Sequence, residues 1–381
     1  MTHRHTDRVL FYTILALVFF GVIMILSSSS AVAETRYRLE MTHFLKHQLM
    51  WLVFASIPAL MIFKRLDFRK LETAQWALGA LGVVVMLQVL AAVFDRSTHR
   101  WLNLAGFHLQ PSEFAKPALV LFLAYFVSGR GSTINNARYS IAPAGLVLTL
   151  LFVSIGLGDL GTAIVLAITA GVIFFVAGLS WRAVAMAGVL LVLAGSVFVA
   201  SKGYRVGRLI GFMDPEYVVL DRIDPNGHIK NYVRQSATTG DFGYHARQSR
   251  IAVGSGGVLG LGLMQSNQKL SFLPEPQTDF IFAIVGEELG LWGTTGVLVG
   301  FLVIFWRGTR LFFVAPNDFG RYLALGVTVS IIVQAFINMT MVLDMIPTKG
   351  IPLPMISYGG NSLLSTMISL GMLLSVSEQS E

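Results

Sequence analysis

The stretch 250–290 reads RIAVGSGGVLGLGLMQSNQKLSFLPEPQTDFIFAIVGEELG. It closes the long polar segment of an otherwise apolar chain, and at Asp279 a loop rich in glycine and proline gives way to an apolar run. A carboxylate at this place is most often a helix cap, and Thr278 or Asp279 is well placed as the N-cap. The helix dipole would then favour the anionic form of Asp279. We expect the chemistry of the chain to take place beside Asp279.

The composition indicates a membrane protein. The 381 residues are 54% hydrophobic and only 13% charged, with a mean hydropathy of +0.68, which is too apolar for a soluble domain. The absence of cysteine excludes disulfides, thiolate metal sites and a cysteine nucleophile. The net charge of +7 comes from basic residues scattered through short loops, a pattern that anionic lipid favours, and we do not expect nucleic-acid binding.

Apolar runs long enough to cross a bilayer occur ten times. We therefore predict an all-α integral membrane protein that forms a single domain over 1–381, and the first run is a retained helix rather than a cleaved signal. The predicted spans are 9–32, 45–63, 72–94, 111–128, 140–158, 160–178, 183–201, 279–305, 320–345 and 361–377.

The distribution of lysine and arginine predicts the orientation. An even number of spans puts both termini on one side. If that side is the cytoplasm, twelve basic residues lie in inner short loops and six in outer ones, as the positive-inside rule requires. Both termini are then cytoplasmic, and the large loop 202–278 between spans seven and eight is extracytoplasmic.

The large loop has two parts of different composition. Its first half mixes apolar and charged residues, as an interfacial helix does, and Asp-Pro pairs interrupt it. Its second half carries five glycines, which indicate either a flexible chain or a backbone that passes close to a ligand. These glycines are Gly254, Gly256, Gly257, Gly260 and Gly262.

Several polar groups occur in apolar surroundings. Glu113 and Lys116 are three residues apart and share a helix face, so they form either a structural ion pair or a charged wall of a water-filled cavity. Arg100 and Trp101 precede them as an interfacial anchor or as part of that cavity. Asp159, between two glycines, is expected to form a turn.

The segment after the ninth span, 338–362, is rich in proline and glycine and cannot form a regular helix. Lipid cannot satisfy irregular backbone, so this segment must line a cavity or be buried in protein. We predict a re-entrant loop that presents Lys349, and the alternative is a solvent-side loop with a snorkelling lysine.

Five blocks together resemble the SEDS family (shape, elongation, division and sporulation). They are RWLNLAGFHLQPSEFAKPALV (100–120), GDLGTAIVL (158–166), RQSRIAVGSGGVLGLGL (247–263), LPEPQTDFIFAIVGEELG (273–290) and IPTKGIPLPMISYGGNS (346–362). The resemblance implies a peptidoglycan glycosyltransferase that polymerises lipid II in the cytoplasmic membrane. It also implies a class B penicillin-binding protein and other divisome membrane proteins as partners, and it matches Asp279 to the family's catalytic aspartate.

Details of these blocks resemble one branch of the family more than the other. Asn338 with the run 347–350, and the GEELG ending at 286–290, are similar to the FtsW-like division branch, with the RodA-like elongation branch as the alternative. The sequence departs from the family at Gln277, where histidine is usual, and at Gly158, where proline is usual. The segment 215–243 also looks longer than the family's loop.

The resemblance assigns roles to the polar residues. Asp279 would be the general base, or would hold a divalent cation such as Mg²⁺. Glu113 and Lys116 would line the same cavity, and the glycine-rich segment would form a movable cover. Contacts to substrate and its phosphates would come from Arg100, Trp101, Lys349, Arg250 and Lys269. Two other functions stay open: a lipid-linked precursor flippase and a non-catalytic divisome scaffold.

Overall fold

The computed structural model describes residues 6–380, except for 36, 96–97, 99, 105–106, 157, 202, 215–218, 220–221, 223, 225–226, 229–230, 233–242, 271–272 and 274. The side chains of residues 104, 107, 132 and 204 are likewise not described. The prediction that the segment 215–243 is longer than the family's loop therefore concerns residues that lie largely outside the described ones.

Among the described residues, the first half of the chain forms five long helical units, two short 3₁₀ turns and one hairpin. They are α1 (Arg8–Thr35), α2 (His43–Trp51) continued through the π-helical turn η1 (Leu52–Ser56) into α3 (Ile57–Arg65), the short η2 (Phe68–Leu71), α4 (Ala74–Phe94), β1 (Leu102–Leu104) paired antiparallel with β2 (Phe107–Leu109), α5 (Pro111–Ser128), η3 (Gly131–Thr133), and η4 (Ala137–Ile141) leading into α6 (Ala142–Gly156).

In the second half, every regular element among the described residues is a helix. This half comprises α7 (Leu160–Val176), α8 (Trp181–Ala200), α9 (Gly203–Met213), α12 (Tyr244–Gly256), α13 (Ile281–Val314), α14 (Asp318–Val342) and α15 (Gly360–Glu378). The helices α9 and α12 belong to the large loop, whose first half was predicted to contain an interfacial helix.

A helix lies at each predicted span. Among the described residues, eight helical units are long and apolar enough to cross a membrane. Of the other two predicted spans, α7 is apolar but only 17 residues long, and α5 carries the charged pair Glu113 and Lys116. The chain is thus a nearly all-helical membrane protein, as predicted from its composition.

Two predicted helix boundaries are wrong. The N-cap of α13 is Phe280, without a side-chain capping bond, so neither Thr278 nor Asp279 is the cap. The same helix, which is kinked at Gly290, runs to Val314 instead of residue 305. Arg307, which lies between the predicted spans 279–305 and 320–345, is inside this helix, and it pairs with Asp7 with 2.5 Å between Nη2 and Oδ2.

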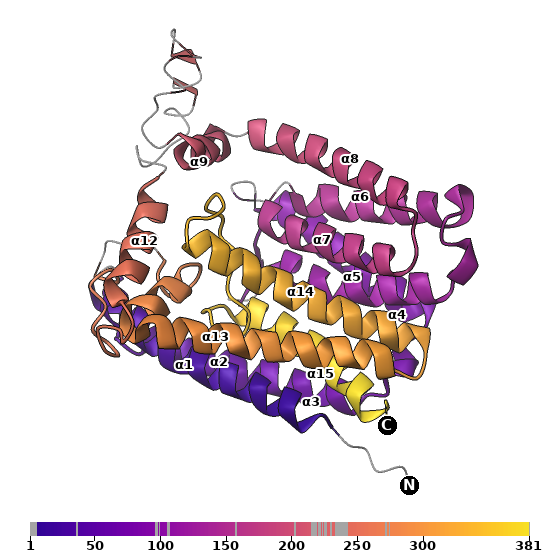
Figure 1. Ribbon diagram of the computed structural model, residues 1–381, viewed down its shortest axis with the longest axis horizontal. Coiled ribbons are helices and arrows are strands. Elements are labelled where there is room, and N and C mark those ends of the chain that lie inside the picture. The colour runs from indigo at the N-terminus through magenta and orange to yellow at the C-terminus, as the bar shows by residue number, and fades with distance from the viewer. Residues whose placement is uncertain are drawn as a thin grey trace.

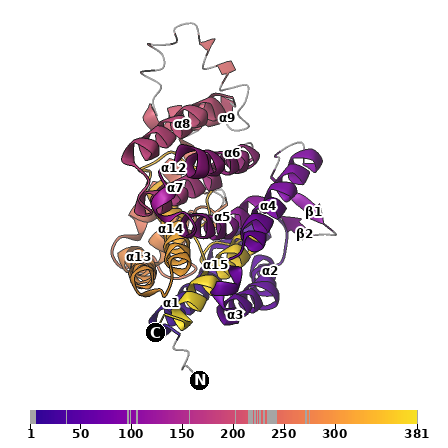
Figure 2. The same ribbon diagram turned by 90° about the vertical axis from the view of Figure 1, so that its right-hand side faces the viewer.

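The helices form a bundle around α5, α14 and α15, most of whose residues are buried. Figure 1 shows the two termini at one end of the bundle and α12 at the opposite end. The termini are joined there, because the backbone N–H of Asp7 donates to Ser377 Oγ at 2.9 Å. Figure 2 shows α8 at the periphery, beyond α6 and α7; none of its residues is buried.

Candidate active site

The segment between α14 and α15 is irregular, and the protein encloses it. It forms no regular helix from residue 343 to 359, although Met355 and Ile356 are buried. A β-carbon placed on Gly21 of α1 would stand 2.6 Å from Met355 O, and one on Gly161 of α7 would stand 2.7 Å from Ile351 Cγ1. Glycines on two helices thus make room for this segment, and the predicted buried, irregular backbone is confirmed.

Asp279 lies against this segment. It is partly buried, and a β-carbon on Gly350 would stand 2.7 Å from its Oδ2 atom. Asn338 of α14 holds the backbone in place, since its Nδ2 donates both to Asp279 O (2.8 Å) and to Ile351 O (2.7 Å). A second tie joins Ser357 Oγ to Thr278 O at 2.6 Å. The backbone that carries the Asp279 carboxylate is therefore held beside residue 350.

The surroundings of Asp279 make it a stronger base than an ordinary aspartate. Burial raises its pKa from 3.8 to about 6, and the negative charges of Glu275 and Asp159 act in the same direction, against Arg100 and Arg208. We expected the helix dipole to favour the anionic form of Asp279, but burial outweighs any such effect. A carboxylate with this pKa is ionised at neutral pH and accepts a proton more readily than a solvated one.

Arg100 and Asp159 form an ion pair near Asp279, with 3.6 Å between Nη2 and Oδ2. Asp159 caps α7 by accepting from Thr162 N at 3.1 Å, so the predicted turn residue has a second role. Burial acts to raise the pKa of Asp159, but the Arg100 charge and hydrogen bonds from Thr162 and Ser112 outweigh burial, and the pKa lies below its usual value. Asp159 thus stays anionic and holds Arg100.

Lys349 belongs to the same electrostatic group. Its ammonium is partly buried, and burial lowers its pKa to about 7; Asp159 opposes this shift, while Arg205, Arg208 and Arg100 add to it. An amine that is only half protonated gains its full charge when an anion binds beside it. Lys349 is suited to bind a phosphate group.

Arg205 and Arg208, which are not among the predicted site residues, complete the group. They lie three residues apart on α9, so they share a helix face. Their charges act on Lys349, and that of Arg208 acts also on Asp279. The spacing of two arginines in an amphipathic helix was the available signal, but a solvated or lipid-facing pair looks the same in sequence.

Glu113 and Lys116 form the predicted ion pair, with 2.7 Å between Lys116 Nζ and Glu113 Oε2. Both are buried, at 2% and 5% exposure, too deep to face an open cavity. Lys116 Nζ also donates to Gln334 Oε1 of α14 at 2.7 Å. The pair is connected to the site through α14, and its own side chains lie within the protein.

Lys269 and Arg250 are not brought to this group. Lys269 is 4% exposed and paired with Glu288 at 2.8 Å. Arg250 is paired with Asp344 at 3.3 Å and its side chain is 65% exposed. Of the predicted site residues, the structure thus brings together Asp279, Lys349 and Arg100. Lys269 and Arg250 are paired with other carboxylates.

The glycine-rich segment packs directly on α13. A β-carbon on Gly260 would stand 2.2 Å from Glu288 O, and Leu261 N and Gly262 N donate to the carbonyls of Glu287 and Glu288 at 3.0 and 2.9 Å. Glycine is needed here because two backbones touch. The segment predicted to be a movable cover is hydrogen-bonded in the structure to the helix that follows Asp279.

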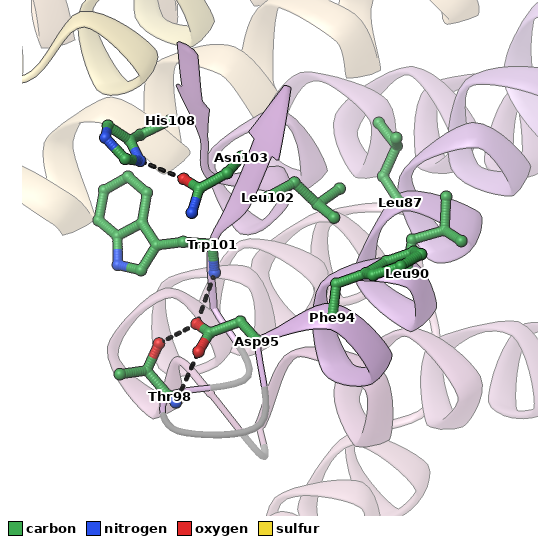
Figure 3. Close-up of a pocket in the computed structure, with 9 residues that line it drawn as sticks. All are labelled: Leu87, Leu90, Phe94, Asp95, Thr98, Trp101, Leu102, Asn103 and His108. Carbon is green, nitrogen blue, oxygen red and sulfur yellow. Dashed lines mark hydrogen bonds between the residues drawn. The ribbon is translucent and has the colours of Figure 1, made fainter. Parts of the chain in front are cut away.

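A cavity of about 820 Å³ opens beside Trp101. Figure 3 shows that α4 contributes Leu87, Leu90 and Phe94, and that the hairpin and its approach contribute polar groups. The backbone N–H of Trp101 donates to Asp95 Oδ2 at 3.2 Å. Asp279 does not line this cavity, but Trp101, the neighbour of Arg100 in the sequence, does. One wall of the cavity is apolar and the other is polar, which suits an amphiphilic ligand.

The donor set around Asp279 does not build a metal site. Within the described ranges no three histidine, aspartate or glutamate side chains could share an ion. A Mg²⁺ ion bound by Asp279 would depend on substrate oxygens and water for most of its ligands, since Asp159 is engaged by Arg100.

Comparison with known proteins places the chain among cell cycle proteins. The model of the FtsW/RodA/SpoVE family, described as "Cell cycle protein", matches residues 7–381. The probable peptidoglycan glycosyltransferase FtsW of Trichlorobacter lovleyi is 34% identical over 377 residues, covering 97% of this chain and 93% of that protein. Stage V sporulation protein E of Bacillus subtilis is 36% identical over 389 residues and covers 100% of both.

Solved structures show the same fold. A chain in the structure described as "Structural coordination of polymerization and crosslinking by a peptidoglycan synthase complex" is similar with a TM-score of 0.73 and 25% identity, covering 98% of this chain and 97% of that one. The rod shape determining protein RodA of Thermus thermophilus is similar with a TM-score of 0.68 and 22% identity, covering 98% and 97%.

Proposed function

Because the chain belongs to the FtsW/RodA/SpoVE family of cell cycle proteins, we propose that it is a peptidoglycan glycosyltransferase that polymerises lipid II. Relatives named as probable peptidoglycan glycosyltransferases support this activity. The observation that carries it is the grouping of one carboxylate of raised pKa, Asp279, with the cations Lys349 and Arg100. Transfer of a sugar from a lipid pyrophosphate needs a base and cations together.

Asp279 is the general base of the proposed reaction. The 4-hydroxyl of one disaccharide attacks the anomeric carbon of another, a new C–O bond forms, and the hydroxyl proton passes to the Asp279 carboxylate. The pKa of about 6 keeps the carboxylate ionised at neutral pH and basic enough to accept that proton. Asn338 positions the Asp279 residue, because Asn338 Nδ2 donates to the Asp279 backbone carbonyl at 2.8 Å.

The cations stabilise the leaving group. When the anomeric C–O bond to phosphate breaks, the lipid pyrophosphate departs with both bonding electrons, and its negative charge has to be neutralised. Lys349 and the arginines that act on its charge, Arg100, Arg205 and Arg208, supply positive charge to the site. The cavity beside Trp101, with one apolar wall, would hold the lipid part of the substrate.

The proposed orientation follows from the charge distribution. Ten spans would place both termini in the cytoplasm and the large loop outside. The site then faces the outer side of the cytoplasmic membrane, where lipid II is polymerised. The position of the two termini at the bundle end opposite α12 supports an even number of crossings.

We assign the activity to septal synthesis, with the elongation role as the alternative. The resemblance of 286–290 and 347–350 to the division branch supports the assignment. Partners would be a class B penicillin-binding transpeptidase and other divisome membrane proteins; a structural neighbour comes from a peptidoglycan synthase complex. Expression in rod-shaped cells depleted of either polymerase tests the role: rescue of septation supports division, and rescue of elongation alone overturns it.

Reconstitution tests the activity itself. The purified chain, with its transpeptidase partner, receives labelled lipid II in detergent, and glycan strands are resolved by electrophoresis. Wild type should form strands and Asp279→Asn should not. Strand formation by Asp279→Asn at the wild-type rate would remove the base assignment. Undiminished lipid II transport in liposomes by the same variant, without strands from either protein, would favour the flippase, and neither activity would favour the scaffold.

A further inference from the structure

Two buried amide side chains on α14 connect distant parts of the site. Gln334 and Asn338 are four residues apart, one helical turn, and are 3% and 0% exposed. Gln334 Nε2 donates to Pro352 O at 2.8 Å. Asn338 Nδ2 donates to Ile351 O at 2.7 Å and to Asp279 O at 2.8 Å. The two amides therefore hold consecutive carbonyls of the irregular segment, directly after Gly350.

Lys116 determines which way the Gln334 amide faces. An ammonium group can only donate, so it selects the oxygen end of the amide, and Lys116 Nζ lies 2.7 Å from Gln334 Oε1. The NH₂ end is then turned to Pro352 O. Glu113 in turn holds Lys116 at 2.7 Å, and its backbone carbonyl accepts from Ser365 Oγ of α15 at 2.6 Å. The chain of bonds runs from the ion pair to the segment beside Asp279.

The ion pair is placed to act on this chain of bonds. Glu113 and Lys116 are buried and bonded to each other and to protein groups. A buried pair of this kind is weak evidence for stability, because desolvation offsets the attraction. Its geometric effect is direct, since a charge-assisted hydrogen bond is stronger and better oriented than a neutral one.

We propose that Gln334 and Asn338 are positioning residues that hold the segment 350–352 against Asp279, and that Glu113 and Lys116 act through Gln334 without touching substrate. The catalytic part of this inference rests on the function proposed above. The structural part, that the amides hold the segment, stands independently and is tested first.

The absence of cysteine makes a direct structural test possible. A single thiol introduced by Thr348→Cys, two residues before Gly350, reports the opening of the segment through its rate of reaction with a maleimide in detergent. Gln334→Glu keeps the shape and the contact with Lys116 but has no donor for Pro352 O. Loss of a buried hydrogen bond with its acceptor left unpaired should raise the labelling rate about tenfold or more.

Thr328→Val is the matched control, because Thr328 is also buried on α14 and its hydroxyl bonds to Ala324 O of its own helix. It should leave the labelling rate unchanged. Asn338→Asp, which loses the donor to both carbonyls, should raise the rate as Gln334→Glu does. Equal labelling of the parent, Gln334→Glu and Asn338→Asp would overturn the proposal whether or not the chain polymerises lipid II.

Kinetics separate positioning from substrate contact. Gln334→Glu should lower kcat by about tenfold to a hundredfold while KM for lipid II changes by less than about twofold. The double variant Glu113→Gln with Lys116→Met avoids an unpaired buried charge. Gln334→Leu is uncharged and also removes the donor to Pro352 O, so it should lower kcat when made alone, and adding it to the double variant should cost little more, since the residues act as one unit. A raised KM in the double variant, with additive loss on adding Gln334→Leu, would mean that Lys116 binds substrate and would overturn the proposal.

Discussion

The Asp279 carboxylate touches the backbone of Gly350 so closely that a β-carbon at 350 would stand 2.7 Å from Oδ2, and its three nearest neighbours would all be atoms of that carboxyl group. The two residues are 71 positions apart: Asp279 precedes α13, and Gly350 follows α14. Asn338 holds both sides of this contact. The orientation of the Asp279 carboxylate, the proposed base, thus depends on a glycine in another segment.

Gly350→Ala should therefore damage activity more than stability. The added methyl group would meet only the carboxylate, which can rotate away, so the fold should be kept while the base is displaced by some tenths of an ångström. We expect polymerisation to fall by about tenfold or more, because small misplacements of a reacting group are costly. Gly171→Ala, whose β-carbon would enter open space, is the control, and equal activity of the two variants would refute the steric argument.

Asp279→Asn should abolish strand formation, since an amide cannot accept the hydroxyl proton. Loss of a general base typically costs about 10²- to 10⁴-fold in rate. The measurement is single-turnover polymerisation of labelled lipid II, which separates chemistry from product release. A rate within a factor of about three of wild type would exclude proton abstraction by Asp279.

The same substitution should stabilise the protein at neutral pH. The pKa of Asp279 is raised on folding from 3.8 to about 6, so ionisation costs folding free energy, and the cost develops as pH rises through that window. At pH 7.5 Asp279→Asn should unfold at a higher temperature, by on the order of 1–3 kcal/mol in stability. Below about pH 4 the two proteins should unfold alike. A constant difference at all pH values would contradict the shifted pKa.

The pH dependence of polymerisation should be bell-shaped and narrow. Asp279 must be ionised, so activity falls below its pKa of about 6, and Lys349 must be protonated, so activity falls above its pKa of about 7. Lys349→Arg should keep the acidic limb and move the alkaline limb above about pH 9, because arginine stays protonated. An unchanged alkaline limb in that variant would exclude Lys349 as its origin.

Arg208→Gln should shift the whole profile toward higher pH. The Arg208 charge lowers the pKa of both Asp279 and Lys349. Its removal raises both pKa values, and both limbs move in the same direction. Arg250→Gln is the matched control, since the exposed Arg250 is paired with Asp344 outside this group, and it should leave both limbs in place. Limbs that move in opposite directions would contradict the shared effect of Arg208.

Gly260→Ala should destabilise the protein. Its φ of +80° is strained for alanine, and a β-carbon would stand 2.2 Å from Glu288 O, a backbone atom that cannot rotate away. We expect a loss on the order of 2 kcal/mol or more, measured as a lower unfolding temperature in detergent. Gly254→Ala, with open space at its β-carbon, should be neutral. Equal unfolding temperatures would mean that the glycine-rich segment is looser than its hydrogen bonds indicate.

Much of the fold could be predicted because the lipid environment constrains it locally. A helix in a bilayer needs a continuous apolar run of bilayer length, and such a run is visible without knowledge of its neighbours. A helix accordingly lies at each predicted span. The helix end at Val314 was misplaced: the added length contains Arg307, whose charge is neutralised by Asp7, 300 positions away in the sequence. No local window contains that partner.

The sequence by itself determined the helical membrane architecture and the irregular segment around Lys349, and it predicted Asp279 as the candidate base. Each of these depends on local composition or on short motifs. Only the tertiary structure decided that Arg205 and Arg208 join the site while Lys269 is neutralised by Glu288. It also decided that Glu113 and Lys116 reach the segment beside Asp279 through Gln334. The physical reason is that the effect of a charge depends on the distance and burial of its partners, and folding alone sets both.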